Sequence, residues 1–339
     1  MRSKFKALGA LAVAAALALT GCTPGGGSNT PTPTSSGDSG GSGNDQFRVV
    51  AFTSGNQTPV GAWWVRAVER KAQELGWDLT MVQGDFDFQK MNPAVESAIG
   101  QGTDIVFDGY TDYASIGSIV TAAKDAGVPM FAVDSGTEPS DAFAINITVN
   151  QEVLVDQTLG ALADALGGSL EGKTIMVLGH DPHAGIRKRA SIAEQKLKEM
   201  GANVADGEIK KIESPATGRT EALKFVADYL AAHPGGLDGV WAGWDDAALG
   251  AAKAIEEAGA TAYVTGVDAI AESVASILNG GALIATAMQP WPEILDMVIA
   301  DIEAYRETGT LPSSNYGEID PVLVDKSNAA DITPSDQLD

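Results

Sequence analysis

The 339-residue chain contains a single cysteine, Cys22, and only three histidines. One cysteine excludes any disulfide within the chain, so a hydrophobic core must hold the fold. Basic residues are also scarce, with 22 Lys and Arg against 45 Asp and Glu, and aromatic residues make up 6% of the chain. A formal charge of −23 repels phosphate backbones and anionic headgroups, so we expect no nucleic-acid partner.

Long apolar runs are missing except at the N-terminus. Residues 7–19 form an Ala- and Leu-rich stretch of 13 residues, which is shorter than the roughly 20 residues that a membrane-spanning helix needs. Three basic residues, Arg2, Lys4 and Lys6, precede it. This order is typical of a signal peptide that is removed from the mature protein, and we predict one over residues 1–21. Its removal leaves 19 basic against 45 acidic residues, a charge of −26.

The apolar run ends in Leu19-Thr20-Gly21-Cys22, which resembles the lipobox of bacterial lipoproteins. The resemblance implies cleavage before Cys22 and acylation of its sulfur and new N-terminus. Two acyl chains give stable membrane anchoring, so we expect the protein on the extracytoplasmic face of the cell membrane. A secretory signal with a chance cysteine is the alternative.

Residues 23–45 contain only Gly, Ser, Thr, Pro, Asn and Asp. Such a segment has no apolar side chain to bury and cannot offset its ordering entropy. We therefore predict that residues 22–45 are a lipidated, disordered tether, with a reach of roughly 25–30 Å.

The body from residue 46 alternates short β-branched runs with segments of helical period, and its length suggests two lobes. This alternation predicts an α/β fold with two doubly wound parallel-sheet lobes. The predicted strands are 47–53, 79–82, 104–107, 129–133, 174–178, 203–209, 239–242, 262–266 and 284–286, and the predicted helices are 60–75, 89–100, 114–126, 186–200, 220–232, 246–258 and 270–279.

Each half contains a helix end, a Gly, a strand and then an aspartate: Asp134 in the first half and Asp268 in the second. Ligands of open α/β sheets bind beyond the carboxyl ends of the strands. We therefore expect Asp134 and Asp268 to face each other across one cleft. The alternative is that each aspartate only caps the helix that follows it.

Other predicted strands also end in polar or aromatic residues, among them Asp112, His183 with Arg187 and Arg189, and Trp244. Trp63 and Trp64 lie near the first strand–helix loop, and Gln289-Pro290-Trp291 follows the strand at 284–286. Charged and amide groups that form bidentate hydrogen bonds, together with flat aromatic faces, suit a polyhydroxylated ligand. Packing in the core is the alternative for each tryptophan.

The order and spacing of several motifs resemble the ribose-type (type I) periplasmic sugar-binding proteins of ABC importers. The motifs are AQELGWDL at 72–79, AGVPMFAVD at 126–134, GIRKRA at 185–190, GVWAGWDDAALGAAKAIEEAG at 239–259, VTGVDA at 264–269, LNGGALIATAMQ at 278–289 and PVLVDK at 321–326. The resemblance covers about residues 46–330. It implies two lobes joined by a three-strand hinge that close on one small ligand and deliver it to a membrane permease.

The resemblance also implies binding residues. The cleft Asp falls on Asp134, the Arg of the second lobe on Arg189, the second Asp on Asp268 and the hinge-side Gln on Gln289. Three positions depart from the pattern of ribose binders: Ser135 replaces an Arg, Trp244 replaces an Asn, and Thr217 replaces an aromatic residue. Trp63 or Trp64 is expected to replace the usual paired aromatics, and Asp112 and His183 to join the site. These departures argue against ribose as the ligand, and another sugar or a polyol remains the expected ligand.

The lobe boundaries follow from the resemblance, with crossovers near residues 147, 289 and 318. The first lobe is expected at 46–147 plus 290–318, the second at 148–288 plus 319–332, and a tail at 333–339. We expect a monomer whose partners are a sugar or polyol, an ABC permease with its ATPase, and the membrane.

Two other functions are alternatives. A receptor for a sensor kinase or chemoreceptor would use the same fold and site. A carbohydrate-active enzyme is disfavoured because the chain has no Ser elbow, P-loop, dinucleotide fingerprint or Cys nucleophile. His180-x-x-His183 beside Asp181 is a weak metal signal because zinc sites need a third ligand. We therefore predict no catalytic residue, no metal and no cofactor.

Overall fold

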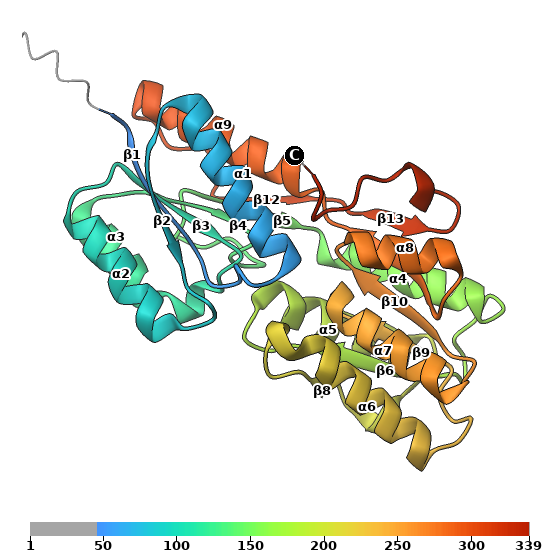
Figure 1. The fold of residues 1–339 in the computed structure, drawn as a ribbon. Helices are drawn as coiled ribbons and strands as arrows, with labels where there is room; N and C mark the ends of the chain where they lie inside the picture. Colours follow the sequence, from blue (N-terminus) through green and yellow to red (C-terminus); the bar gives the residue numbers. More distant parts are fainter. Residues whose placement is uncertain (1–45, 339) are drawn as a thin grey trace, which may run out of the picture. The chain divides into compact units, whose positions relative to one another are not determined.

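A computed structural model describes residues 46–338, and they form two α/β lobes (Figure 1). The predictions for residues 1–45, namely the signal peptide, the acylated Cys22 and the tether, lie outside the described residues. Within 46–338 no helix is long and apolar enough to cross a membrane.

The first lobe contains a six-stranded parallel sheet in the order β12-β5-β4-β3-β1-β2. Its four inner strands are buried on both faces, which is why they read as apolar runs, whereas the edge strands β2 and β12 are partly exposed. The strands are β1 (Arg48–Thr53), β2 (Asp78–Gln83), β3 (Ile105–Gly109), β4 (Met130–Val133), β5 (Ile145–Val149) and β12 (Tyr316–Ile319).

Helices cover both faces of this sheet (Figure 1). The face with Val49 and Ala51 packs against α1 (Pro59–Leu75) and α9 (Trp291–Thr308). The face with Val50 and Phe52 packs against α2 (Phe88–Gly100) and α3 (Gly117–Ala126).

Local signals set the bounds of α1. The Thr58 hydroxyl accepts a hydrogen bond from the Gly61 amide and caps the helix, Pro59 occupies the first turn, and Gly76 ends it with φ 70°. Gly61 is needed for packing as well, because a Cβ atom there would lie 2.1 Å from the carbonyl oxygen of Gly55. These signals place the start of α1 directly beside the loop after β1.

The second lobe contains a seven-stranded sheet in the order β13-β11-β10-β9-β6-β7, with β8 also paired to β6. Its β11–β13 pair is antiparallel and the other pairs are parallel. The strands are β6 (Thr174–Gly179), β7 (Asn203–Val204), β8 (Lys210–Lys211), β9 (Gly239–Ala242), β10 (Tyr263–Val267), β11 (Leu283–Met288) and β13 (Val322–Asp325).

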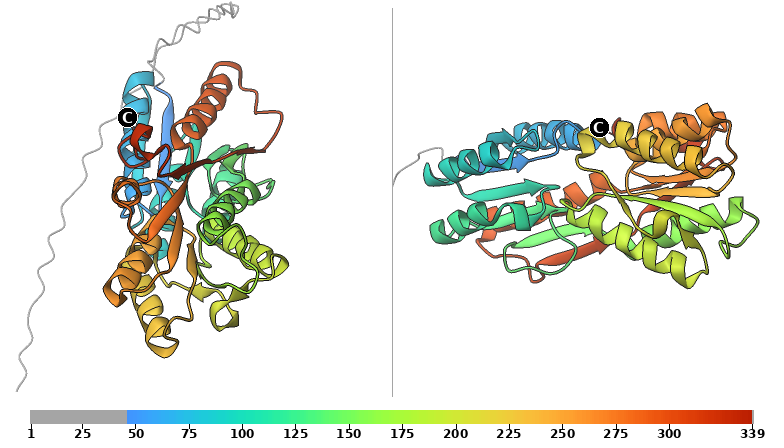
Figure 2. Two further views of the ribbon diagram at one scale, coloured as in Figure 1. Left: turned by 90° about the vertical axis from the view of Figure 1, so that its right-hand side faces the viewer. Right: turned by 90° about the horizontal axis from the view of Figure 1, so that it is seen from below.

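Helices α4 (Gln151–Ala165) and α5 (Ala184–Glu199) contribute to the core on one face of this sheet. Helices α6 (Gly218–Ala232), α7 (Asp245–Ala258) and α8 (Ala271–Asn279) contribute to the core on the other. Short 3-10 turns are η1 (Tyr113–Ser115), η2 (Ala205–Gly207), η3 (Pro215–Thr217) and η4 (Ala329–Asp331). The views in Figure 2 show these layers from two further sides.

The chain passes between the sheets three times: from β5 to α4, from β11 to α9 and from β12 to β13. These passages lie close to the crossovers expected near residues 147, 289 and 318. We call residues 46–149 and 291–319 lobe 1, and residues 151–288 and 322–332 lobe 2. A single apolar cluster runs from α1 and α9 of lobe 1 to α4 and α5 of lobe 2.

The fold class agrees with the prediction from sequence, but two predicted elements were wrong. The strand predicted at 203–209 is two short strands, β7 and β8, separated by η2, where Asp206 has a positive φ. The helix predicted at 114–126 begins as α3 at Gly117, because Asp112 caps the separate turn η1 first. The strands β5 and β12 and the helices α4 and α9 were not predicted.

Candidate ligand-binding cleft

A cavity lies where the carboxyl ends of strands from both sheets meet. Lobe 1 contributes the loops after β1, β2, β3 and β4, and lobe 2 those after β6, β9, β10 and β11. The cavity has a volume of about 120 Å³, which suits one small molecule.

Most of the predicted site residues meet here. The lining residues are Ser54, Gly55, Thr58, Pro59, Val60, Gly61, Phe86, Phe88, Tyr110, Asp112, Asp134, His180, Pro182, His183, Ile186, Arg189, Pro215, Trp244, Asp246, Asp268, Ile270, Gln289 and Trp291.

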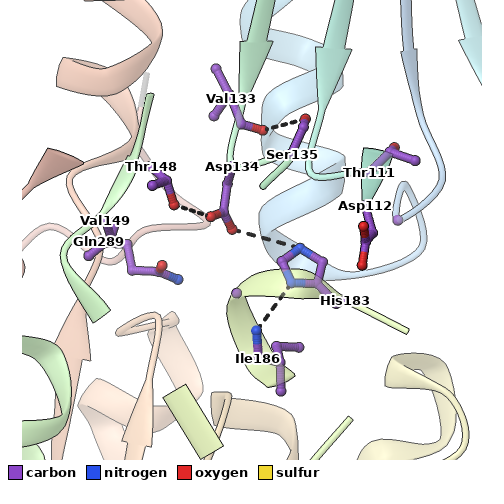
Figure 3. A network of polar contacts seen from close by, with 12 residues as sticks. Thr111, Asp112, Val133, Asp134, Ser135, Thr148, Val149, His183, Ile186 and Gln289 are labelled. Carbon is purple, nitrogen blue, oxygen red and sulfur yellow. Dashed lines mark hydrogen bonds and ion pairs between the residues drawn. The ribbon is translucent and has the colours of Figure 1, made fainter. Parts of the chain in front are cut away.

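Asp134 of lobe 1 faces His183 of lobe 2 (Figure 3). The Thr148 hydroxyl donates to Oδ1 of Asp134, and Oδ2 lies 3.7 Å from Nε2 of His183. The Ile186 amide donates to Nδ1 of His183 at 3.3 Å, so the ring proton belongs on Nε2, toward Asp134. Burial lowers the pKa of His183, and the histidine is therefore a neutral donor beside the carboxylate.

Arg189 is 2% exposed and lies in the first turns of α5. Its Nε donates to the Gly185 carbonyl at 3.1 Å, while Nη1 has no hydrogen-bond partner within residues 46–338. Burial lowers the pKa of Arg189, and the charges of Asp134 and Asp268 oppose this shift. A buried guanidinium with a free donor is costly to leave unpaired, so this group is suited to bind a ligand acceptor.

Asp268 follows β10 and accepts a 2.7 Å hydrogen bond from Nε2 of Gln289. Burial raises the pKa of Asp268 to about 7, against the lowering effects of Arg189 and Gln289. Oε1 of Gln289 has no partner in the described part of the chain. The pair therefore offers a carboxylate oxygen and an amide oxygen as acceptors.

Aromatic side chains form much of the wall. Trp244 and Trp291 are 6% and 1% exposed, and neither Nε1 has a hydrogen-bond partner among the described residues. The ring of Tyr110 packs edge to face against Trp291 at 4.8 Å. The ring of Trp244 lies so close to Gly218 that a Cβ atom there would be 2.6 Å from its Cζ2. These indoles offer both a flat apolar face and a donor.

The prediction that Trp63 or Trp64 contacts ligand was wrong, because neither residue lines the cavity. Trp63 is 2% exposed and its Nε1 donates to the Leu338 carbonyl at 2.7 Å. Trp64 is fully buried and packs edge to face against Phe107 and Tyr110. Both indoles lie in the apolar core of lobe 1.

Asp112 lines the cavity but is already engaged. Its Oδ1 accepts a hydrogen bond from the Ala114 amide at 3.0 Å, and its Oδ2 lies 2.9 Å from Nη2 of Arg187 in lobe 2. The residue expected to contact ligand is therefore one half of an ion pair between the lobes.

Several lining residues were missed by sequence reasoning. Phe86 and Phe88 follow β2, and Asp246 in the first turn of α7 pairs with Arg219 at 2.6 Å. Tyr110 follows β3 and is followed directly by Thr111 and Asp112. Their position just after a strand was the available signal, since the same rule identified Asp134 and Asp268.

The two histidines of the His-x-x-His motif do not converge on a metal. Nδ1 of His180 contacts the Ile212 carbonyl at 2.9 Å, whereas His183 faces Asp134. Over residues 46–338 no group of three His, Cys, Asp or Glu side chains could hold a metal ion.

Comparison with known proteins agrees with this architecture. A family model described as a periplasmic binding protein domain matches residues 49–305. The chain is 26% identical over 288 residues to a D-apiose import binding protein of Actinobacillus succinogenes, a match that covers 84% of this chain and 90% of that protein. It is 28% identical over 250 residues to a ribose import binding protein of Bacillus subtilis, with coverages of 72% and 77%.

Solved structures share the fold. An ABC transporter solute-binding protein from Agrobacterium vitis with bound allitol superposes with a TM-score of 0.76 at 19% identity, covering 84% of this chain and 97% of that one. Another from Mycobacterium smegmatis with bound glycerol has a TM-score of 0.72 at 25% identity, with coverages of 84% and 96%. The chain therefore belongs to the periplasmic binding protein domain family, whose members are extracytoplasmic solute-binding proteins and not enzymes.

Proposed function

We propose that this protein binds one monosaccharide or polyol in the cavity between its lobes and delivers it to an ABC permease. The observation that carries the proposal is a set of buried polar groups without partners within residues 46–338, drawn from both lobes. These are Nη1 of Arg189, Nε1 of Trp244, Nε1 of Trp291, Oε1 of Gln289 and the hydroxyl of Tyr110.

Hydroxyl groups suit this set because each can donate and accept a hydrogen bond. The arginine and the indoles supply donors, while Asp268 and Gln289 supply acceptors. Each buried group that stays unpaired costs about 1–3 kcal/mol, so a ligand that satisfies several of them gains affinity and selectivity together. The flat faces of Trp244 and Trp291 suit the C–H side of a carbon chain or sugar ring.

The names of relatives support the same ligand class. The similar proteins include D-apiose, ribose and xylitol binders, and structures of similar fold hold allitol, glycerol and myo-inositol. These ligands share vicinal hydroxyls and carry no charge.

We further propose that the mature chain acts as a monomer, anchored to the extracytoplasmic face of the membrane through acylated Cys22. The lipobox-like Leu19-Thr20-Gly21-Cys22 and the following polar segment support this. Metabolic labelling with a palmitate analogue should label the parent chain and not Cys22→Ser, and an unlabelled parent chain would refute the anchor.

A ligand screen tests the binding function. The full chain with Cys22→Ser is titrated with D-apiose, D-ribose, xylitol, allitol, D-allose and myo-inositol, and its melting temperature and Trp fluorescence are followed. A bound ligand at 100 times its Kd should stabilise the fold by about 2.7 kcal/mol. Asp268→Ala should abolish the response, while Asp331→Ala, an exposed aspartate of the same lobe, should retain it. Responses to amino acids or nucleosides alone would refute the ligand class.

A further inference from the structure

The turn that carries Asp268 has an unusual backbone. Asp268 has φ 121° and the next residue, Ala269, has φ 57°. Side chains other than glycine rarely adopt this region, and they stay there only when the surrounding contacts hold them. The contacts that hold this turn therefore also place the Asp268 carboxylate.

Lobe 2 supplies three of these contacts. The Asp268 amide donates to the Ala287 carbonyl at 2.9 Å, and the Ala269 amide donates to the Thr286 hydroxyl at 3.2 Å. The Ile270 amide donates to Oδ2 of Asp245 at 3.0 Å. Together these three bonds satisfy the backbone amides of residues 268–270.

The C-terminal tail supplies two more. The Ser335 amide donates to the Ala269 carbonyl at 3.0 Å, and Oδ1 of Asp336 accepts a hydrogen bond from the Ala271 amide at 2.9 Å. Ala271 is the first residue of α8, whose own N-cap residue, Ile270, has no side chain that could cap it. Asp336 takes this role from the other end of the chain and places a negative charge at the positive end of the helix.

The same tail also contacts lobe 1. Nε1 of the buried Trp63 donates to the Leu338 carbonyl at 2.7 Å, and Nη2 of Arg66 donates to the Asp336 carbonyl at 3.2 Å. The Leu338 side chain packs against the apolar cluster that contains Trp63. Both views of Figure 2 place the C-terminal end beside α1.

Residues Ser335–Leu338 therefore join two supports of the ligand cavity. One is the Asp268 turn of lobe 2, and the other is α1 of lobe 1, whose first residues, Pro59 to Gly61, line the same cavity. Rotation of one lobe against the other would move Trp63 relative to Ala271, so the tail must shift or release a contact.

We propose that Ser335–Leu338 is an interlobe strap that positions Asp268 for ligand and holds lobe 1 toward lobe 2. The positioning of Asp268 rests on the proposed function, whereas the restraint on the lobes does not. Loss of either end of the strap lets the lobes separate further and frees the turn, so ligand dissociates faster.

The distance between the lobes tests the strap without any ligand. The full chain with Cys22→Ser has no cysteine, so Lys124→Cys in lobe 1 and Lys224→Cys in lobe 2, both exposed, take spin labels cleanly. Trp63→Phe and Asp336→Ala should each shift the distribution of label distances in the ligand-free chain to longer values. The matched controls should not: Trp77→Phe loses a similar indole bond, to Glu303 within lobe 1, and Asp331→Ala removes another C-terminal aspartate.

Titration with D-ribose, D-apiose and xylitol follows on the same variants. We expect about tenfold weaker binding in Trp63→Phe and Asp336→Ala, mostly through faster dissociation, and partial rescue in Asp336→Asn, whose amide oxygen can still cap α8. Distance distributions unchanged from the parent would overturn the strap. A parent chain that binds none of these sugars would refute the proposed function and leave the distance test of the strap in force.

Discussion

Asp112 and Arg187 form an ion pair between the two lobes, with 2.9 Å between Oδ2 and Nη2. The Asp112 side chain is 4% exposed and the Arg187 side chain 47%. The carboxylate is held in place by its cap on the Ala114 amide, while the guanidinium reaches it from α5. The two residues thus link the loop after β3 to the helix that carries Arg189.

Removal of this pair should weaken ligand binding modestly. Because Arg187 is half exposed, solvent screens the pair, and such pairs contribute about 0–1 kcal/mol. We expect Arg187→Ala to raise the Kd for the bound sugar up to about fivefold, with a smaller effect at 1 M salt. Calorimetric titration at two salt concentrations measures this, with the exposed neighbour Lys188→Ala as control. A salt-independent loss of 100-fold or more would instead mean that Arg187 contacts ligand directly.

Ligand affinity should depend on pH through Asp268. Its pKa of about 7 means that the carboxyl is half protonated at neutral pH, and charge-assisted bonds from ligand hydroxyls need the ionised form. We expect affinity to fall as pH decreases from 8 to 6, by at most about tenfold per pH unit. Burial lowers the pKa of His183, so its protonation contributes less to this slope than that of an ordinary histidine. Calorimetry at several pH values measures the slope, and a slope that persists in Asp268→Asn would assign it to another group.

The same carboxyl should affect the stability of the ligand-free fold with the opposite trend. In the unfolded chain Asp titrates near 3.9, whereas in the fold the pKa of Asp268 is about 7. Between these values the folded state binds more protons, so the contribution of Asp268 to the free energy of unfolding decreases as pH rises from 4 to 7. Urea unfolding of parent and Asp268→Asn should diverge in this window, and parallel curves would contradict the raised pKa.

Trp244 lines the cavity, whereas Trp241 lies in the core, so the two residues should have different roles. Nε1 of Trp244 is free within residues 46–338, whereas Nε1 of Trp241 donates to the Thr158 hydroxyl at 2.8 Å. We expect Trp244→Phe to weaken sugar binding by about tenfold, since a hydrogen bond contributes about 0.5–1.5 kcal/mol, and to reduce the fluorescence change on binding. Trp241→Phe should lower the melting temperature and leave the Kd unchanged. Weaker binding in Trp241→Phe together with an unchanged Kd in Trp244→Phe would contradict this assignment.

Trp64 should matter for stability and not for ligand contact. It is fully buried between Phe107 and Tyr110, and loss of a large aromatic from a core costs about 3–5 kcal/mol. We expect Trp64→Ala to lower the free energy of unfolding by this amount in urea. A variant of unchanged stability that no longer binds sugar would return Trp64 to the site.

Much of the architecture could be predicted because parallel strands buried on both faces read as apolar runs. The runs at β1, β4 and β10 were identified from such patterns, and their ends located Asp134 and Asp268. The sequence predicted one strand where the structure has β7 and β8. The turn between them depends on the left-handed backbone of Asp206, and no hydrophobic periodicity marks that residue.

The aromatic residues show where a pattern stops being informative. Trp63 and Trp64 are neighbours in α1, and which way they face depends on the rotation of the helix against the sheet. The residues near Thr58 mark the start of the helix, but they do not show which side of the helix packs against the sheet. Trp244 and Trp291 reach the cavity wall instead, and so do Phe86 and Phe88, because their loops leave the strands at the edge that faces the other lobe.

The sequence by itself determined the class of fold and the placement of Asp134 and Asp268 at one cleft. These depend on local periodicity and on the rule that loops at the carboxyl ends of parallel strands gather at one edge. Only the tertiary structure decided which charges pair, because Asp112 and Arg187 lie 75 positions apart, and which group caps α8, because Asp336 lies 65 positions from Ala271. Such contacts depend on how the two lobes and the C-terminal tail pack together, which no local pattern encodes.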